Sequence, residues 1–205
     1  PDDISVRSIS QRMSATGTTV IHMPTDWTSL SEGRLVGRTT EGGGAIETWR
    51  LDVPLARGFA AGPYDAARQR IGDRDVSVYL LSSKKATAER QAEVLGLAIE
   101  AMEKRFGAFP FPSYGIAEVP RKRFDWYAAS QQGFILADAR SLRVPDGNLP
   151  LFAHEAAHAW WGSTVGGHGP GAILCTESLA QYGAVVAIEA VRGVDAATEF
   201  LEFSA

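Results

Sequence analysis

Hydrophobic and polar residues alternate along the first part of the chain in the pattern of half-buried β-strands. Residues 18–23 are rich in β-branched side chains and end at a proline, and residues 46–53 alternate apolar with polar before a second proline. Residues 39–44 include three consecutive glycines and favour a turn between these segments. With a further strand at residues 59–64, the pattern predicts a β-rich region from residue 4 to about residue 72.

Strands and helices alternate in the rest of the chain. Short apolar runs at residues 76–81, 116–120 and 127–136 each predict a strand. A polar, glycine-containing stretch precedes the first of them, and we place a domain boundary there. Residues 1–74 are then expected to form part of a β-rich domain, and residues 75–205 a second domain.

Residues 87–106 predict the clearest amphipathic helix apart from the helix pair in the last third of the chain. Thr87 can cap its amino end and Gly107 can close it. The apolar residues recur at helical spacing and predict a stripe that packs into the core. The stripe consists of Val94, Leu97, Ala98, Ala101, Met102 and Phe106.

A pair of helices is predicted in the last third of the chain. Asp146 or Asn148 can cap the first, and Pro150 fits its first turn, where a missing N–H group does no harm. Glycines and a proline in residues 162–171 break this helix, and the apolar run at residues 173–191 restarts one. Two helices joined by such a loop can pack antiparallel against each other.

The composition is that of an ordinary globular protein, with 45% hydrophobic and 21% charged residues among 205. The net charge of −4 gives no reason to expect nucleic acid as a partner, because such binding needs clustered Lys and Arg. No stretch reaches the ~20 apolar residues of a membrane span, so we expect none within this chain. The single cysteine, Cys175, excludes an internal disulfide, and its apolar neighbours favour a buried structural thiol over an active-site thiol.

Residues 154–158 carry the H-E-x-x-H pattern. Residues four apart share one face of a helix, so His154 and His158 can direct imidazole nitrogens at one metal ion. Glu155 lies beside them, where it can reach a metal-bound water without being a ligand. The flanking apolar residues indicate a buried helix and disfavour the alternative of two solvated surface histidines. We therefore expect one catalytic zinc ion, which needs three protein ligands and leaves a fourth position for water.

Glu177, which eighteen intervening residues separate from the second histidine, is the candidate for the third ligand. If the two predicted helices pack antiparallel, its carboxylate comes beside the histidines. His154, His158 and Glu177 then form a two-histidine, one-carboxylate zinc site. We expect no role in this site for His22, which lies in a predicted strand, or for His168, which lies between glycines in the loop.

With these segments the chain resembles the M1 family of zinc metallopeptidases, the aminopeptidase N-like gluzincins. The match consists of H-E-x-x-H, eighteen residues and then Glu, and it extends upstream to residues 106–112. Residues 177–182 are more similar to the M1-like domains of bacterial membrane-associated proteins, some fused to transporter permeases, than to the soluble aminopeptidases. The resemblance covers nearly the whole chain. It implies an α+β fold, in which a thermolysin-like catalytic domain of a small mixed sheet and helices follows part of a β-sheet domain.

Two departures from the family pattern bear on specificity. The common aminopeptidases have a G-x-M-E-N strand whose Glu holds the free amino terminus of the substrate, and Ser130 stands at that position here. A hydroxyl cannot pair with an ammonium group as a carboxylate does. The family also supplies a tyrosine well downstream of the third ligand to stabilise the oxyanion, and we nominate no tyrosine of this chain for that role. The chain is therefore expected to be a fragment, truncated at its C-terminal end.

The strand that contains Ser130 has a second expected use. The resemblance implies an edge strand beside the metal, which holds an extended peptide by main-chain hydrogen bonds. The small side chains of Ala128, Ala129 and Ser130 would let such a peptide approach. An ordinary core strand that ends at Gly133 is a comparably good interpretation of the residues alone.

The resemblance implies a zinc metallopeptidase that hydrolyses peptide bonds of a peptide or protein substrate, with Glu155 as general base. The alternative is a catalytically silent, zinc-containing peptide-binding or sensing domain of a membrane-associated protein. Ser130 favours that alternative, whereas the intact Glu155 disfavours it. The substrate preference and the compartment do not follow from the sequence, and the resemblance is compatible with a membrane-associated or exported parent protein.

Overall fold

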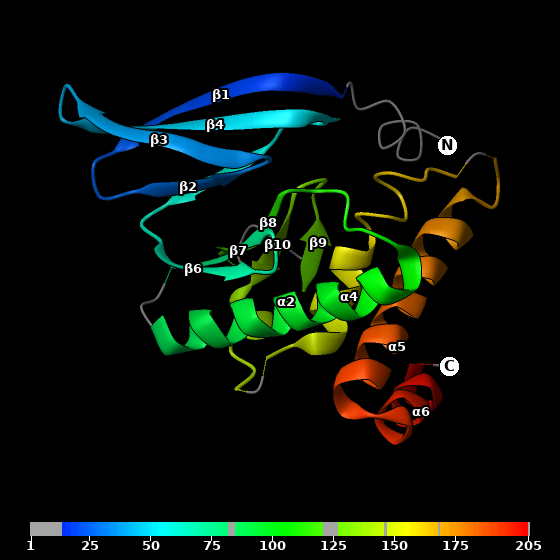
Figure 1. Cartoon of the computed structure of the whole chain (residues 1–205). Coiled ribbons are helices and arrows are strands. Elements are labelled where there is room, and N and C mark those ends of the chain that lie inside the picture. Colours follow the sequence, from blue (N-terminus) through cyan, green and yellow to red (C-terminus); the bar gives the residue numbers. More distant parts are fainter. Residues whose placement is uncertain (1–13, 82–84, 121–126, 146, 168, 205) are drawn as a thin grey trace, which may run out of the picture.

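The computed structural model describes residues 14–81, 85–120, 127–145, 147–167 and 169–204. A π-helical turn, η2, leads directly into helix α5. The elements are β1 (Ala15–Pro24), β2 (Thr28–Ser31), β3 (Arg34–Glu41), β4 (Gly44–Leu55), β5 (Phe59–Gly62), β6 (Asp65–Ile71), β7 (Arg74–Leu80), α2 (Lys85–Phe106), β8 (Ser113–Val119), β9 (Ala128–Ser130), β10 (Phe134–Asp138), α3 (Ala139–Leu142), α4 (Leu149–Ala157), η2 (Leu174–Ser178), α5 (Leu179–Arg192) and α6 (Val194–Ser204). Figure 1 shows three layers, with the N-terminal strands on one side of a central sheet and the helices on the other.

The N-terminal strands form two small antiparallel sheets. Strand β4 lies between β1 and β3, and β2 pairs with β5. Strands β1 and β4 confirm the predictions at residues 18–23 and 46–53. Strand β3 was not predicted, and it extends to Glu41. The turn is therefore shorter than expected and centres on Gly42 and Gly43, whose φ angles of 57° and 82° suit glycine.

The central sheet has five strands in the order β6-β7-β8-β10-β9. The inner strands β7, β8 and β10 run parallel, whereas β6 and β9 pair antiparallel at the two edges. The domain boundary expected after residue 74 falls in the hairpin of β6 and β7, so strand β6 joins the sheet that follows it. The fold is thus mixed α+β, with β9 at a free edge.

The central sheet is covered on both faces, and most of the buried residues of its inner strands are apolar. On β7, Val76 and Val78 pack with the helices, whereas Tyr79 points to the N-terminal strands. Strand β10 divides in the same way, with Ile135 towards the helices and Phe134 towards the N-terminal strands. Because side chains alternate along a strand, a sheet covered on both faces needs apolar residues at nearly every position.

Helix α2 confirms the predicted amphipathic helix, with two corrections. It begins at Lys85, so Thr87 lies inside the first turn and does not cap the helix. Leu97 is exposed although it was placed in the apolar stripe, because the buried face is centred on Leu95 and Ile99 instead. Gly107 ends the helix as predicted, with a φ of 90° and an N–H group that donates to the Glu103 carbonyl at 3.0 Å.

The single strand predicted at residues 127–136 is wrong, since the chain forms two antiparallel strands there. Strands β9 and β10 are joined by a turn in which the Gln131 N–H group donates to the Phe134 carbonyl at 2.7 Å. Gly133 in this turn lies so close to the turn between β2 and β3 that a Cβ atom would come within 2.8 Å of the Glu32 Cγ. Close approach of the N-terminal strands therefore requires glycine at this position.

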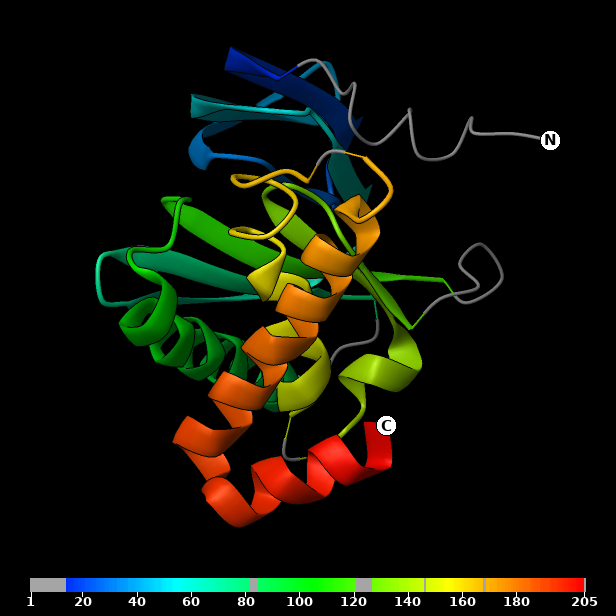
Figure 2. The ribbon, with the colours of Figure 1, turned by 90° about the vertical axis from the view of Figure 1, so that its right-hand side faces the viewer.

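Helices α4 and α5 pack side by side and also pack on α2, and α6 crosses the far end of α5 (Figure 2). Asn148 occupies the N-cap position of α4 but makes no side-chain cap bond, whereas Asp146, the other predicted cap, lies outside the described residues. Pro150 lies in the first turn as predicted. None of the helices in the described part of the chain has the length and apolar character that a membrane span requires.

Candidate metal centre

Helix α4 positions both histidines of the H-E-x-x-H motif. Phe152, Ala153 and Ala156 are fully buried and fix one face of the helix in the core. His154 lies in its last turn, and His158 follows the last helical residue with backbone angles that are still helical, φ −60° and ψ −15°. The two imidazole rings therefore lie on one side of the helix, with their centroids 5.0 Å apart.

Glu177 lies in the π-helical turn η2 that precedes α5. Such turns carry one residue more than an α-helical turn and often occur at functional sites. Helix α5 approaches α4 closely at Gly183, where a Cβ atom would lie 2.5 Å from the Ala157 Cβ. The absence of a side chain at Gly183 lets the two helices approach closely, which brings Glu177 and the histidines together.

The three predicted ligands converge in space. Their ligand atoms all lie within 4.8 Å of one another. The Glu177 Oε2 atom is 3.4 Å from His154 Nε2 and 3.6 Å from His158 Nε2. Metal bonds of about 2.0–2.1 Å in tetrahedral geometry place ligand atoms roughly 3.4 Å apart. The donor set and its spacing therefore fit a zinc ion.

The remaining nitrogen of each imidazole ring has a partner of its own. His154 Nδ1 lies 3.1 Å from the Gln181 side-chain oxygen, and His158 Nδ1 lies 3.1 Å from the Trp161 carbonyl oxygen. Because both partners accept hydrogen bonds, each Nδ1 carries the proton and each Nε2 keeps its lone pair for a metal. The sequence interpretation missed these two roles. Gln181 could have been found from its position four residues after Glu177, on the same helical face.

Glu155 is only 8% exposed and points into the protein beside the ligand cluster. Burial raises the pKa of its carboxyl group, and the neighbouring Glu177 adds to that rise. His154 and a hydrogen bond from the Ser130 backbone act in the opposite direction but leave the pKa above its usual value. A carboxylate with a raised pKa beside a metal-binding cluster is suited to accept and release a proton.

The predicted substrate strand lies at the edge of the sheet, beside α4. Strand β9 pairs only with β10 among the described strands, so one side of its main chain has no strand partner. The Ala128 side chain is buried in the core, whereas Ala129 and Ser130 are half-buried. The Ser130 hydroxyl lies 3.3 Å from the Tyr114 hydroxyl, which in turn donates to the Glu155 carbonyl at 3.2 Å. This contact links the edge strand to the helix that bears the histidines.

Three residues weighed as possible site members lie elsewhere or are not described. His22 is exposed on β1, and His168 lies outside the described residues. Cys175 is exposed, so the prediction of a buried thiol is wrong. It lies in η2, where the neighbouring Ile173 and Leu174 also face solvent. An apolar run at the start of a helix therefore did not indicate burial here.

The fold is similar to that of solved M1 zinc metallopeptidases. The M1 zinc metallopeptidase from Deinococcus radiodurans aligns over 93% of this chain and 44% of its own, with a TM-score of 0.69 and 21% sequence identity. A mutant of it bound to a Tyr-Ser-Ala substrate aligns over the same shares, with a TM-score of 0.69 and 20% identity. A mutant two-domain M1 zinc metallopeptidase bound to L-arginine gives a TM-score of 0.70 at 20% identity, over 93% of this chain and 44% of that one. This chain thus spans less than half the length of these proteins.

No protein-family model and no curated protein matches the sequence. At 20–21% identity the likeness to the solved structures concerns the fold. The fold of this chain is therefore similar to that of part of an M1 zinc metallopeptidase.

Proposed function

We propose that this protein is a zinc-dependent metallopeptidase with a thermolysin-like catalytic domain. The observation that carries the proposal is the convergence of His154, His158 and Glu177 at the spacing of a tetrahedral zinc site, with a buried carboxylate beside them. The M1 fold of the chain supports the same assignment. The single zinc ion would be held by these three side chains, with Gln181 and Trp161 orienting the rings.

Zinc, when bound, supplies a Lewis acid for the scissile carbonyl group and lowers the pKa of a water to about 7. Glu155 acts as general base and takes a proton from the attacking water. It then delivers that proton to the nitrogen of the leaving amine. The raised pKa of Glu155 lies closer to neutral pH than that of an ordinary carboxyl group, and both proton transfers benefit from this.

The substrate is proposed to lie along the free edge of β9 as an added antiparallel strand. The main-chain groups on the side of β9 away from β10, apart from the Ser130 N–H group that bonds Glu155, would hold an extended peptide irrespective of its side chains. Ala128 can contribute only its main chain, because its side chain is buried. Ala129 and Ser130 are small and partly exposed, and they leave room for a peptide beside the metal site.

Ser130 bears on which peptides are cleaved. Its hydroxyl is close to Tyr114 and to the Gln131 carbonyl, and it carries no charge with which to hold an ammonium group. We therefore propose that the protein hydrolyses peptide bonds by the same reaction as an aminopeptidase, but that residue 130 does not select substrates with a free amino terminus.

The test is cleavage by the full-length protein of matched peptides with free and acetylated amino termini, before and after zinc removal with 1,10-phenanthroline. The proposal expects cleavage that disappears with the metal and returns when zinc is added back. It also expects the acetylated peptide to be cleaved at least as well as the free one. If no peptide is cleaved by the zinc-loaded protein, the peptidase assignment is wrong, whereas a strict demand for a free terminus would refute only the role given to Ser130.

A further inference from the structure

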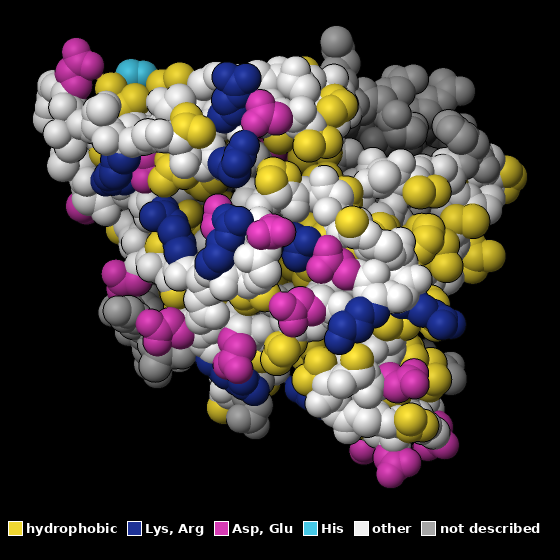
Figure 3. All heavy atoms as spheres, viewed as in Figure 1, with side chains coloured by type: hydrophobic (Ala, Val, Ile, Leu, Met, Phe, Trp, Pro, Cys, Tyr) yellow, Lys and Arg dark blue, Asp and Glu magenta, His cyan; other side chains and the backbone are white. Residues whose placement is uncertain are grey.

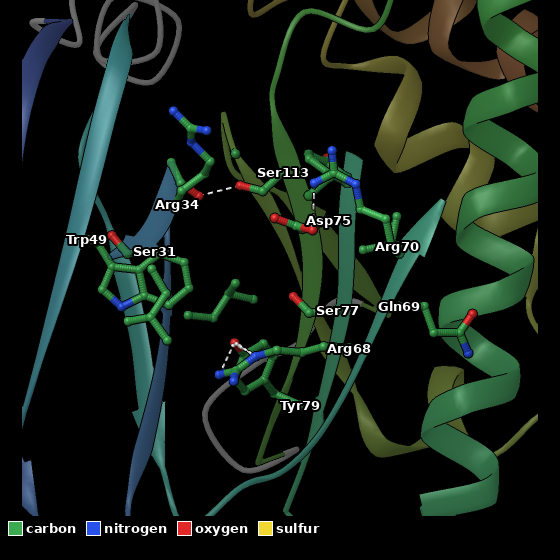
Figure 4. Close-up of a pocket in the computed structure, with 16 residues that line it drawn as sticks. Ser31, Arg34, Trp49, Arg68, Gln69, Arg70, Asp75, Ser77, Tyr79 and Ser113 are labelled. Atoms are coloured by element: carbon green, nitrogen blue, oxygen red, sulfur yellow. Dashed lines mark hydrogen bonds and ion pairs between the residues drawn. The ribbon is translucent and has the colours of Figure 1, made fainter. Parts of the chain in front are cut away.

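A hollow lies where the N-terminal strands meet the central sheet, and none of the three proposed metal ligands lines it. Its volume is about 330 Å³, and it is lined by β2, β3 and β4 on one side and by β6, β7 and β8 on the other. Arginine side chains gather on this part of the surface in Figure 3, and Figure 4 shows the lining residues. Hollows between two packed units are common positions for small-molecule sites.

One arginine in this hollow has no ion-pair partner among the residues that the structure describes. Two of its three lining arginines have carboxylate partners: Arg70 with Asp75 at 3.1 Å, and Arg34 with Asp52 at 3.4 Å. For Arg68, no carboxylate of the described residues lies within ion-pair distance.

The Arg68 guanidinium is held in place by an uncharged group. Its Nη2 donates to the Tyr79 hydroxyl at 3.1 Å, and its central carbon lies 5.6 Å from the centroid of the Tyr79 ring. Burial of Tyr79 raises the pKa of its phenol, so this partner remains neutral. A fixed guanidinium without a counter-ion is a binding group for an anion.

The opposite wall of the hollow is apolar. In Figure 4, Trp49 lies on the side of the N-terminal strands and Arg68 and Ser77 lie on the side of the central sheet, whereas Gln69 points away towards α2. The polar edge of the indole is already satisfied, because Trp49 Nε1 donates to the Ser29 hydroxyl at 2.9 Å. Leu30 and Leu35 extend this wall. The hollow therefore presents a cation on one side and an aromatic, apolar surface on the other.

We propose that this hollow is a binding site for a small organic carboxylate with a flat, apolar body. Arg68 pairs with the carboxylate, Ser77 offers a hydroxyl beside it, and the apolar body lies against Trp49. A single unpaired guanidinium suits one carboxylate better than a doubly charged phosphate, and an apolar wall offers nothing to a small inorganic anion. The site is independent of the proposed peptidase activity.

The test is binding of 3-phenylpropionate to the zinc-free, full-length protein, measured by saturation-transfer NMR. Removing zinc prevents the carboxylate from binding at the metal centre, so the assay does not depend on the proposed activity. We expect a Kd of about 5 mM or tighter, as the size of the probe allows. The uncharged 3-phenylpropionamide and inorganic phosphate should each bind about fivefold more weakly or not at all.

Arg68→Gln is the informative variant, because Arg68 is exposed on an edge strand and the protein should fold without its charge. We expect the Kd for 3-phenylpropionate to rise by about fivefold or more. Arg192→Gln removes the same charge from the exposed end of α5 and should leave the Kd unchanged. Equal binding of the acid and the amide, tighter binding of phosphate, or an Arg68→Gln protein that binds like the wild type would each overturn the proposal.

Discussion

Replacing Gly183 by alanine should weaken zinc binding without touching any ligand. The new Cβ atom would lie 2.5 Å from the Ala157 Cβ and 3.0 Å from the Met102 sulfur, where carbon atoms normally keep about 3.5–4.0 Å. Helices α4 and α5 would then separate by roughly 1 Å, and Glu177 would move away from the histidines. Zinc can restore the close approach only against an overpacking cost of about 1–3 kcal/mol. That cost corresponds to zinc binding weakened by roughly 5- to 150-fold.

The measurement is competition for zinc between the protein and a chromophoric chelator, with thermal unfolding recorded in parallel. Gly96→Ala is the matched control, because Gly96 also lies in a helix, α2. A Cβ atom there would clash with the Ile71 side chain of strand β6 and not with α4 or α5. Gly183→Ala should lose stability even against the gain in helix propensity of about 1 kcal/mol, whereas in Gly96→Ala the end of the Ile71 side chain can move aside. Only Gly183→Ala should lose zinc affinity. Unchanged zinc affinity in Gly183→Ala, or equal losses in the two variants, would refute the link between helix spacing and the metal site.

Two further substitutions test other parts of the structure. Gln181→Leu removes the acceptor for His154 Nδ1 and should weaken zinc binding by about 10–100-fold in the same chelator assay, and a change of less than twofold would contradict the orienting role. Glu47→Gln tests the N-terminal sheets. Burial alone would raise the pKa of Glu47. Hydrogen bonds from Ser29, Arg38 and Thr28 outweigh this effect and hold the pKa below its usual 4.5. Because the folded-state pKa is lowered, the ionised carboxylate stabilises the fold above about pH 4.5 and loses this effect as the pH falls through the folded-state value. Urea unfolding should therefore show Glu47→Gln to be about 2 kcal/mol less stable at pH 7, with a smaller loss on acidification than the wild type, and parallel pH profiles would contradict this.

Long periodic segments were predictable because local pattern determines them. Strands β1 and β4 and helix α2 follow from alternation and from helical spacing, since one face of each must be buried. The errors occur where tertiary contacts decide. The turn between β9 and β10 packs against Glu32, which lies about a hundred positions away from Gly133 in the chain. No local window of sequence contains that contact.

In the candidate site, too, some features were predictable from the local sequence and others depend on tertiary packing. The H-E-x-x-H spacing places His154 and His158 on one side of a helix whatever the rest of the chain does. The partners of their Nδ1 atoms depend on how α5 packs and on the turn after α4, and a motif does not specify either. Glu177 and the exposed Cys175 both lie in the π-helical turn η2, which an apolar run cannot reveal.

The proposal of a zinc peptidase with Glu155 as its general base is tested most directly by Glu155→Gln in the full-length protein. Zinc content and peptide cleavage are measured on the same samples, with the wild type alongside. We expect one zinc ion per chain in both proteins and a fall in cleavage rate of roughly 10²–10⁴-fold in the variant, because glutamine cannot take the proton. Cleavage at the wild-type rate would contradict the role of Glu155, and loss of zinc from the variant would mean that Glu155 helps to hold the ion.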